Sequence, residues 1–276
     1  MQKTETRNSR TMHIDQESTV GILRLIQDEN YIAVKAIEEA LPDIEKACDE
    51  ITRRMALGGR LIYMGAGTSG RLGVMDAVEC PPTYGVSREL ISGIIAGGYD
   101  RMVTAAEGAE DNAEAGIHDL SEKNPGPNDT VLGISAAGNA AYVAEALSYA
   151  RKLGCLTVGL SCNHGSRLDV ESDISIVTDT GAEPITGSTR MKAGSAHKMV
   201  LNMISTCAMI KMGNVYENLM INLKPTNIKL KRRMISIVCE ILGCEEDKAV
   251  ELLEKYNWSI REAVEYSRRN EKGKVQ

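Results

Sequence analysis

Phenylalanine is absent from this chain of 276 residues, tryptophan occurs once, and aromatic residues together make up only 4% of it. A core must therefore be filled mainly by leucine, isoleucine and methionine, together with nine tyrosines. Hydrophobic residues still account for 43% of the chain, which is enough to bury a substantial core. The length allows one large domain or a main domain with an appendage, and we favour the second.

Paired cysteines and long apolar runs are also missing. The seven cysteines are scattered and never spaced as CxxC, which is typical of reduced intracellular thiols and not of a disulfide framework. The most apolar long segment, residues 199–212, is interrupted by polar and charged residues and falls short of a membrane-spanning helix. Residues 1–19 are polar and lack the pattern of a signal peptide. We therefore expect a cytoplasmic protein with no membrane partner.

The chain also lacks a net positive charge, and histidine is scarce. The net charge of −6 argues against a nucleic-acid partner, because such proteins need broad basic faces, and an anionic ligand would need local positive loops. The four histidines show no paired spacing, so no metal site is predicted. Cys162 and His164 are neighbours, but the sequence adds no further metal ligands and nothing that would activate the thiol as a nucleophile.

Short apolar runs alternate with helical patterns after two N-terminal helices. Apolar residues at helical spacing predict those helices at residues 19–28 and 31–57, with a break around Glu29 and Asn30. Strands are predicted at residues 60–64, 90–96, 130–135, 156–160 and 174–178, and helices at residues 72–78, 111–122, 140–153 and 191–212. The alternation is typical of an α/β fold with a doubly wound, mainly parallel sheet between helical layers.

From residue 227 onward the chain changes character. Three short helices are predicted at residues 228–242, 246–256 and 259–269, with Gly243 and Asn257 as breaks. The sequence thus predicts three parts. They are an N-terminal helical segment at residues 1–56, the main domain at residues 57–226, and a three-helix region at residues 227–276.

Residues 181–198, GAEPITGSTRMKAGSAHK, bring hydroxyl groups, three glycines and three basic side chains to the start of an apolar helix. Because a helix N-terminus attracts anions, this stretch predicts an anion-binding loop. The alternative is an ordinary capped turn, since serine and threonine are common N-caps. In doubly wound sheets ligands bind beyond the carboxyl ends of the strands, where residues 65–73 and 135–141 also lie.

Residues 65–73, GAGTSGRLG, allow a tight turn from strand to helix, in which Thr68 and Ser69 can hold a phosphate. The rival interpretation is a dinucleotide site, because GAGTSG fits GxGxxG. Only Glu89 stands where a ribose-binding acid would be needed, and Arg71 suits a phosphomonoester better. We therefore favour a phosphate group over a dinucleotide.

Two carboxylates stand out by their surroundings. Glu79, in DAVECPPTYG, is predicted to end a helix before a Pro-Pro turn, and Glu110 lies in the small-residue segment AAEGAEDNAE. Two such acids can share acid and base work if their surroundings separate their pKa values. The alternative is a pair of solvated surface acids, since the chain has 38 acidic residues.

Taken together, these motifs closely resemble the N-acetylmuramic acid 6-phosphate etherases, a branch of the SIS superfamily that also includes the glucokinase regulatory proteins. The resemblance spans nearly the whole chain. It rests on GAGTSGRLG, AVECPPTYG, AEGAED and residues 181–198, on RN, IDQEST and ILRLI near the start, and on a tail similar to a ubiquitin-associated domain. It implies a SIS-type, flavodoxin-like three-layer fold.

The resemblance further implies a cofactor-free lyase that splits the D-lactyl ether of N-acetylmuramic acid 6-phosphate into N-acetylglucosamine 6-phosphate and D-lactate. Glu79 matches the acid that protonates the departing oxygen, and Glu110 matches the base at C2, although the two roles could be exchanged. A homodimer with shared active sites is implied in the same way. The alternatives are a sugar-phosphate sensor without catalysis and an aldose-ketose isomerase on the same fold.

The substrate's phosphate and carboxylate would need cations and neutral donors. The residues expected to bind it are Thr68, Ser69, Gly70, Arg71, Ser135, Asn139, Glu183, Ser188, Thr189, Arg190 and Lys192. One departure stands out, because this chain reads SAAGNAA where these etherases usually read like SGRT. Each lost hydroxyl donor would cost about 1 to 3 kcal/mol if the phosphate went unpaired, so we expect the other two loops to bind more of the anion.

Overall fold

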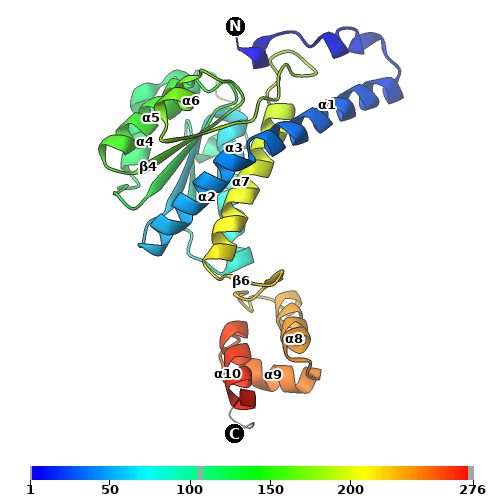
Figure 1. Ribbon diagram of the computed structural model, residues 1–276, viewed down its shortest axis with the longest axis vertical. Coiled ribbons are helices and arrows are strands. Elements are labelled where there is room, and N and C mark those ends of the chain that lie inside the picture. The colour runs from blue at the N-terminus through cyan, green and yellow to red at the C-terminus, as the bar shows by residue number, and fades with distance from the viewer. Residues whose placement is uncertain (1, 105–107, 273–276) are drawn as a thin grey trace. The chain divides into compact units, whose positions relative to one another are not determined.

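The structure is a computed structural model that describes residues 2–104 and 108–272, with side chains of the last helix described as far as residue 267. The chain forms two compact units (Figure 1). Unit 1 comprises residues 1–78 and 89–208, and unit 2 comprises residues 79–88 and 209–276. The N-terminal helices thus belong to the same unit as the sheet, and residues 79–88 and 209–226 belong to the same unit as the tail. This division differs from the predicted boundaries at residues 57 and 227.

Five parallel strands form the sheet of unit 1 in the order β2-β1-β3-β4-β5. They are β1 (Leu61–Gly65), β2 (Ile91–Ile95), β3 (Thr130–Ile134), β4 (Leu156–Ser161) and β5 (Ile174–Val177). Every residue of β1, β3 and β4 is buried, as strands covered on both faces must be. The predicted doubly wound α/β fold is confirmed, and each strand was predicted to within one residue at either end.

Helices cover both faces of this sheet. On one face α5 (Ala141–Lys152) packs so closely that a Cβ on Gly133 would lie 2.5 Å from Val143. Beside it lie α4 (Ala113–Ser121) and the short α6 (Arg167–Glu171), which the sequence did not predict (Figure 1). On the other face a Cβ on Gly73 of α3 (Gly67–Tyr84) would lie 2.9 Å from Tyr63. The Tyr63 hydroxyl donates to Asp76 of α3 at 2.9 Å.

The N-terminal helices are α1 (Thr19–Glu39) and α2 (Leu41–Ala56), so the break predicted around Glu29 and Asn30 is wrong. The helix continues there because Glu29 is 1% exposed and accepts hydrogen bonds from two cations instead of facing water. The chain bends at Ala40 instead. Pro42 stands in the first turn of α2, where its missing N–H leaves no bond unmade.

Helix α3 (Gly67–Tyr84) is longer than predicted and continues through Pro81 and Pro82. The predicted Pro-Pro turn is therefore wrong, and Glu79 lies inside the helix instead of at its end. The helix ends at Gly85, whose φ of +69° favours glycine and whose N–H donates to the Pro81 carbonyl at 2.9 Å. Helix α7 (Lys192–Lys211) agrees with its prediction to within one residue at either end.

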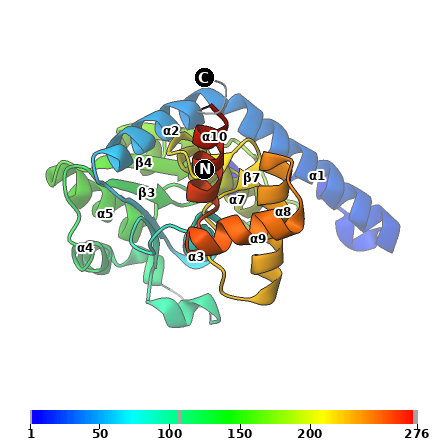
Figure 2. The same ribbon diagram turned by 90° about the horizontal axis from the view of Figure 1, so that it is seen from below.

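Unit 2 contains the three predicted tail helices, α8 (Ile228–Leu242), α9 (Glu246–Lys255) and α10 (Ile260–Lys272) (Figure 2). The Asn227 side chain caps α8 by accepting from the Leu230 N–H at 2.8 Å, and Gly243 ends it with a φ of +62°. The helices share a core that includes Met234, Val238 and Leu253. The sequence did not predict the short hairpin of β6 (Val215–Tyr216) and β7 (Leu219–Met220) that precedes them.

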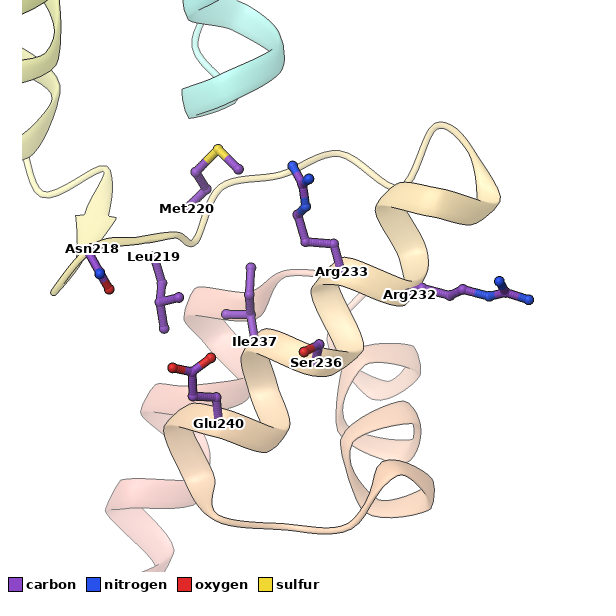
Figure 3. A pocket seen from close by; sticks show the side chains of 8 residues that line it. All are labelled: Asn218, Leu219, Met220, Arg232, Arg233, Ser236, Ile237 and Glu240. Atoms are coloured by element: carbon purple, nitrogen blue, oxygen red, sulfur yellow. The ribbon is translucent and has the colours of Figure 1, made fainter.

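A groove of about 540 Å³ lies in unit 2 between the hairpin and α8 (Figure 3). Leu219, Met220 and Ile237 supply its apolar part, and Arg233 and Glu240 supply charge at its edges. None of the residues expected from the sequence to bind substrate lines it. Within residues 2–104 and 108–272, no helix is long and apolar enough to cross a membrane.

Candidate functional site

The turn from β1 to α3 brings two backbone segments into direct contact. A Cβ on Gly70 would lie 2.5 Å from the Gly65 carbonyl oxygen, and a Cβ on Gly65 would lie 2.6 Å from the Gly70 nitrogen. Gly67 has a φ of +53°, which side chains rarely adopt. The three glycines are thus needed for geometric reasons. They place the first turn of α3 at the carboxyl end of β1, next to the point where the strand order reverses.

Thr68 and Ser69 lie in this first turn of α3 and are half-buried. A Cβ on Gly194 of α7 would lie 3.3 Å from the Thr68 methyl group, so the N-terminal turns of α3 and α7 touch. The segments at residues 65–73 and 181–198, predicted separately, therefore meet at one edge of the sheet. Two helix N-termini side by side make this edge electrostatically favourable for an anion.

Arg71 belongs to the same turn, but its guanidinium is engaged elsewhere. Its Nε donates to the Met102 carbonyl at 3.2 Å and an Nη donates to the Thr104 carbonyl at 2.9 Å. In this arrangement Arg71 holds the segment that follows β2.

In the segment after β3, the expected binding residues Ser135 and Asn139 form hydrogen bonds within the protein. Ser135 is buried and its hydroxyl accepts from the Gly138 N–H at 3.0 Å. Gly138, with a φ of +79°, packs directly against Ser166 at the start of α6. The Asn139 side-chain oxygen accepts from the Arg167 N–H at 2.9 Å. The oxygen of Asn139 therefore caps α6.

Glu183 already supplies an anion to the start of α7. Its carboxylate accepts from the backbone N–H groups of Lys192 at 2.9 Å and Ala193 at 3.0 Å, and its side chain is fully buried. Burial raises the pKa of Glu183 above its ordinary value, although the two amides oppose the shift. The loop thus fills part of its own anion-binding position with a carboxylate from within the chain.

Lys192 is fully buried as well, and its ammonium donates to Glu29 of α1 at 2.5 Å. Arg10 donates to the same carboxylate through Nε at 2.5 Å and Nη at 3.0 Å. Burial alone would raise the pKa of Glu29, but the bonds from Arg10 and Lys192 outweigh it and hold the pKa below its ordinary value. The Lys192 charge is therefore matched within the protein.

Three expected binding residues of the same loop remain at the surface. Ser188 and Thr189 are half-buried and Arg190 is exposed. A turn closed by the Ser188 N–H and the Ile185 carbonyl at 2.9 Å holds them next to the first turn of α7. These residues and the first turn of α3 are the parts of the expected site that stay accessible and adjacent.

The two expected catalytic acids are exposed. Glu79 lies on α3 in the stretch that belongs to unit 2, and its carbonyl accepts from the Thr83 hydroxyl at 2.8 Å. Glu110 lies in unit 1, in a 3-10 turn (Ala109–Asp111) that follows Gly108 at a φ of +72°. Because the acids belong to different units, their pairing stays a prediction.

Sequence reasoning missed a strap formed by residues 2–16, which crosses the carboxyl edge of the sheet. Asn163, after β4, accepts from the Lys3 N–H at 2.9 Å and donates to Thr4 and to the Ala136 carbonyl at 3.1 Å each. Further along, the strap reaches the segment before α7. The only signals in the sequence were the RN and IDQEST motifs, which carried the resemblance but had no structural explanation.

Sequence reasoning also missed the buried carboxylate of Asp76 and the buried pair of His197 and Cys162. Asp76 accepts from Tyr63 and, at 2.6 Å, from Asn202 of α7, and burial raises its pKa. His197 of α7 lies 3.3 Å from the Cys162 thiol, and both side chains are buried. Burial lowers the pKa of His197 to about 4 and raises that of Cys162 to about 11. Both are therefore neutral near pH 7, which suits a packed core better than catalysis.

Metal and disulfide chemistry find no support in this arrangement. Among the residues that the structure describes, no three His, Cys, Asp or Glu side chains are grouped to hold a metal ion. All seven cysteines lie in the described part, and none of them forms a disulfide. The arrangement at the sheet edge can bind an anion through amides, hydroxyls and arginine.

Comparisons with known proteins agree with this geometry. Residues 43–151 match the model of a family described as the glucokinase regulatory protein N-terminal SIS domain. Over 261 residues the chain is 50% identical to the N-acetylmuramic acid 6-phosphate etherase of Clostridium beijerinckii and 51% identical to that of Bacillus subtilis. Each match covers 95% of this chain and 86% of the relative.

A solved structure of a phosphosugar isomerase homologue from Bacteroides fragilis, described as involved in capsule formation, resembles the chain with a TM-score of 0.52. The match covers 71% of this chain and 94% of that one, at 21% sequence identity. This likeness extends to the fold alone.

Proposed function

Since the chain belongs to the family of N-acetylmuramic acid 6-phosphate etherases, we propose that it cleaves the D-lactyl ether of N-acetylmuramic acid 6-phosphate. The products are N-acetylglucosamine 6-phosphate and D-lactate. The observation that carries the proposal is the identity of about half of all aligned residues over 95% of the chain. Convergence of the first turns of α3 and α7 at the sheet edge supports it independently.

The chemistry needs two proton transfers and no cofactor. In the ring-opened sugar the C1 aldehyde acidifies the C2 proton, so a carboxylate can remove it. The C3–O bond then breaks and lactate leaves as an alkoxide, which is a poor leaving group and needs a proton. Water adds at C3 of the unsaturated aldehyde to give the product. We assign these two transfers to Glu110 at C2 and Glu79 at the departing oxygen, and the roles could be exchanged.

The phosphate is assigned to the first turn of α3. Thr68, Ser69 and the Gly70 amide offer neutral donors there, and Ser188, Thr189 and Arg190 approach from the adjoining loop. Glu183 and Lys192 act indirectly, because their charges are used to hold the start of α7. Ser135 and Asn139 likewise stabilise the loops after β3 and β4, so we assign the phosphate to the other two segments.

The length of α3 supports the proposal of a homodimer with shared sites. Glu79 is eleven residues beyond Thr68, so the two are separated by about 16 Å along the helix axis. That separation exceeds the distance from phosphorus to C2 in a hexose 6-phosphate. A sugar whose phosphate binds the first turn of α3 would therefore meet Glu79 of the partner subunit. Glu110 would come from the subunit that binds the phosphate.

Helix α1 offers a surface for such a dimer. Val20, Leu23, Tyr31 and Val34 are each more than half exposed, although all four are apolar or aromatic. At 100° per residue they fall within about a quarter turn of the helix, so they form one stripe. A stripe of this kind is typical of a helix that packs against another chain. We also propose a cytoplasmic location, which the free-thiol chemistry of seven cysteines without a disulfide supports.

The test is direct. The purified protein is incubated with N-acetylmuramic acid 6-phosphate, and D-lactate is measured by a coupled enzymatic assay. We expect lactate and N-acetylglucosamine 6-phosphate in equal amounts, with solvent deuterium at C2 of the product. Glu79→Gln and Glu110→Gln should each lower kcat by about 100-fold or more, because each removes one proton transfer.

The sharing of sites is tested by mixing the two variants. Each variant alone should keep little activity, but mixed dimers contain one site with both glutamates, so activity should return on mixing. The matched control is Glu45→Gln, which changes an exposed carboxylate on α2. Absence of lactate from the unmodified protein contradicts the proposed reaction. Full activity in Glu79→Gln or in Glu110→Gln would contradict only the assignment of the residue that was changed.

A further inference from the structure

We infer that Arg7, presented by the N-terminal strap, binds the carboxylate of the substrate's lactyl group. The inference rests on the proposed function and adds a residue that determines substrate specificity. It follows from three observations on unit 1: how the expected cations are used, where the strap is attached, and which cation of the strap is left without a partner.

The substrate carries two anionic groups, and the cations first expected to bind them are mostly committed. Arg71 donates to the Met102 and Thr104 carbonyls, and Lys192 is buried against Glu29. Of the three expected cations, Arg190 alone stays exposed. One arginine beside the phosphate leaves the lactyl carboxylate without a positively charged partner. The net charge of −6 makes an unmatched second anion unfavourable.

The strap is attached to the same loop that supplies Ser188, Thr189 and Arg190. The Asn8 side-chain amide donates to the Ala182 carbonyl at 3.1 Å, and the Thr11 hydroxyl donates to the Pro184 carbonyl at 2.8 Å. On the other side of Arg7, a Cβ on Gly187 would lie 3.6 Å from the Glu5 carboxylate. Arg7 is therefore flanked on both sides by residues that touch the segment at residues 182–187.

The strap's three cations differ in how they are matched. Lys3 pairs with Asp179 and Arg10 pairs with the buried Glu29. Arg7 is exposed, and no residue within 2–104 or 108–272 forms an ion pair or hydrogen bond with its side chain. The attachment of the strap thus uses the charges on either side of Arg7 and leaves its guanidinium available to a ligand.

A guanidinium suits this ligand because its planar N–H groups match a carboxylate in two parallel hydrogen bonds. The first turn of α3 offers amides and hydroxyls to the phosphate at one end of the sugar. The strap offers a guanidinium to the carboxylate at the substituent on C3. Such a division gives the site a way to tell the substrate from the product N-acetylglucosamine 6-phosphate, which keeps the phosphate and lacks the carboxylate.

The product therefore provides the experiment. Kinetics with N-acetylmuramic acid 6-phosphate are compared with competitive inhibition by N-acetylglucosamine 6-phosphate for Arg7→Ala, Arg7→Lys and the unmodified protein. Arg7→Ala should lower kcat/KM about 10- to 100-fold, mainly through KM, and leave the inhibition constant of the product unchanged. Arg7→Lys should recover part of the loss, since it keeps the charge but not the two parallel bonds.

Two variants serve as controls. Arg190→Ala should weaken both the substrate and the product, because its expected partner is the phosphate. Lys46→Ala removes an exposed positive charge from α2 and should change neither. An unchanged KM in Arg7→Ala would overturn the inference, as would an equal loss of product binding. Either result requires an active unmodified enzyme, so failure of the proposed function would be recognised separately by the absence of lactate.

Discussion

Helices α3 and α7 begin side by side at the same edge of the sheet, yet their N-termini are built in opposite ways. The start of α3 is built around three glycines and offers hydroxyls and amides, with no acidic residue in its first turn. The start of α7 is covered by the carboxylate of Glu183 and anchored by the buried Lys192. One helix end is left open to an external anion, and the other is closed by an internal one.

Under the proposed function, the difference explains how a protein of negative net charge holds a doubly anionic ligand in a defined place. Both helix N-termini favour anions, so without Glu183 they would offer a ligand two competing binding positions. Glu183 occupies one of them permanently. Ser188, Thr189 and Arg190 then lie next to the closed end of α7, beside the open end of α3.

The largest effect is expected from Glu29→Gln, which leaves the fully buried Lys192 ammonium without its counter-charge. The free energy of unfolding should fall by about 3 to 5 kcal/mol, measured by urea denaturation. The double variant Glu29→Gln/Lys192→Met should recover much of this loss, because no buried charge remains. If the separate losses of Glu29→Gln and Lys192→Met simply add in the double variant, the pair does not anchor α7. Glu38→Gln, on the exposed side of α1, is the control.

A smaller loss is expected from Glu183→Ala, which opens the closed helix end. The amides of Lys192 and Ala193 lose their acceptor, so the free energy of unfolding should fall by about 2 to 3 kcal/mol. Hydrogen exchange of these two amides should also become faster. A loss below about 0.5 kcal/mol would mean that water replaces the carboxylate, and the contrast with α3 would then disappear.

The open end can be tested with two glycines that differ in kind. Gly70→Ala would place a Cβ 2.5 Å from the Gly65 carbonyl, so we expect a loss of about 2 kcal/mol. Gly67→Ala meets no atom within 4 Å and has only its φ of +53° against it, which costs about 1 kcal/mol. Urea denaturation of both variants gives the order. Equal losses would show that close approach of the backbones does not matter.

The last effect concerns proton binding at the closed end and depends on pH. Burial lowers the pKa of His197 from 6.5 to about 4, so between these values the unfolded chain binds a proton that the folded chain does not. Stability should therefore fall with decreasing pH in this window, by up to about 1.4 kcal/mol per pH unit. In His197→Gln the decline between pH 6 and pH 5 should be shallower. An unchanged slope would mean that His197 takes up its proton in the folded state.

Most of the fold could be predicted because its signals are local. The five strands are short apolar runs bounded by glycine or polar residues, and the tail helices have a cap at Asn227 and a break at Gly243. The errors came from residues whose partners are distant in sequence. Glu29 suggested a helix break, but it is satisfied by Lys192, which is 163 positions away.

The candidate site was predictable in outline for a different reason. A parallel sheet gathers the segments after β1 and β3 and the segment before α7 at one edge, so the loops could be named without contacts. Which of their charges face a ligand could not be predicted. Arg71, Glu183 and Lys192 carry the composition of a binding site, yet each bonds to the protein. The strap could not be predicted because its polar residues show no helical or strand periodicity.

The strap has a consequence for synthesis of the chain. Its partners lie far downstream, since Gln2 donates to the Ala137 carbonyl 135 positions later and Thr11 donates to that of Pro184, 173 positions later. A ribosome adds about 5 to 20 residues per second, so residues 2–11 spend many seconds without their acceptors. The sheet and the segment before α7 have to form before residues 2–11 can dock. Residues 2–11 are thus among the last parts of unit 1 to reach their native contacts, although they are synthesised before the sheet.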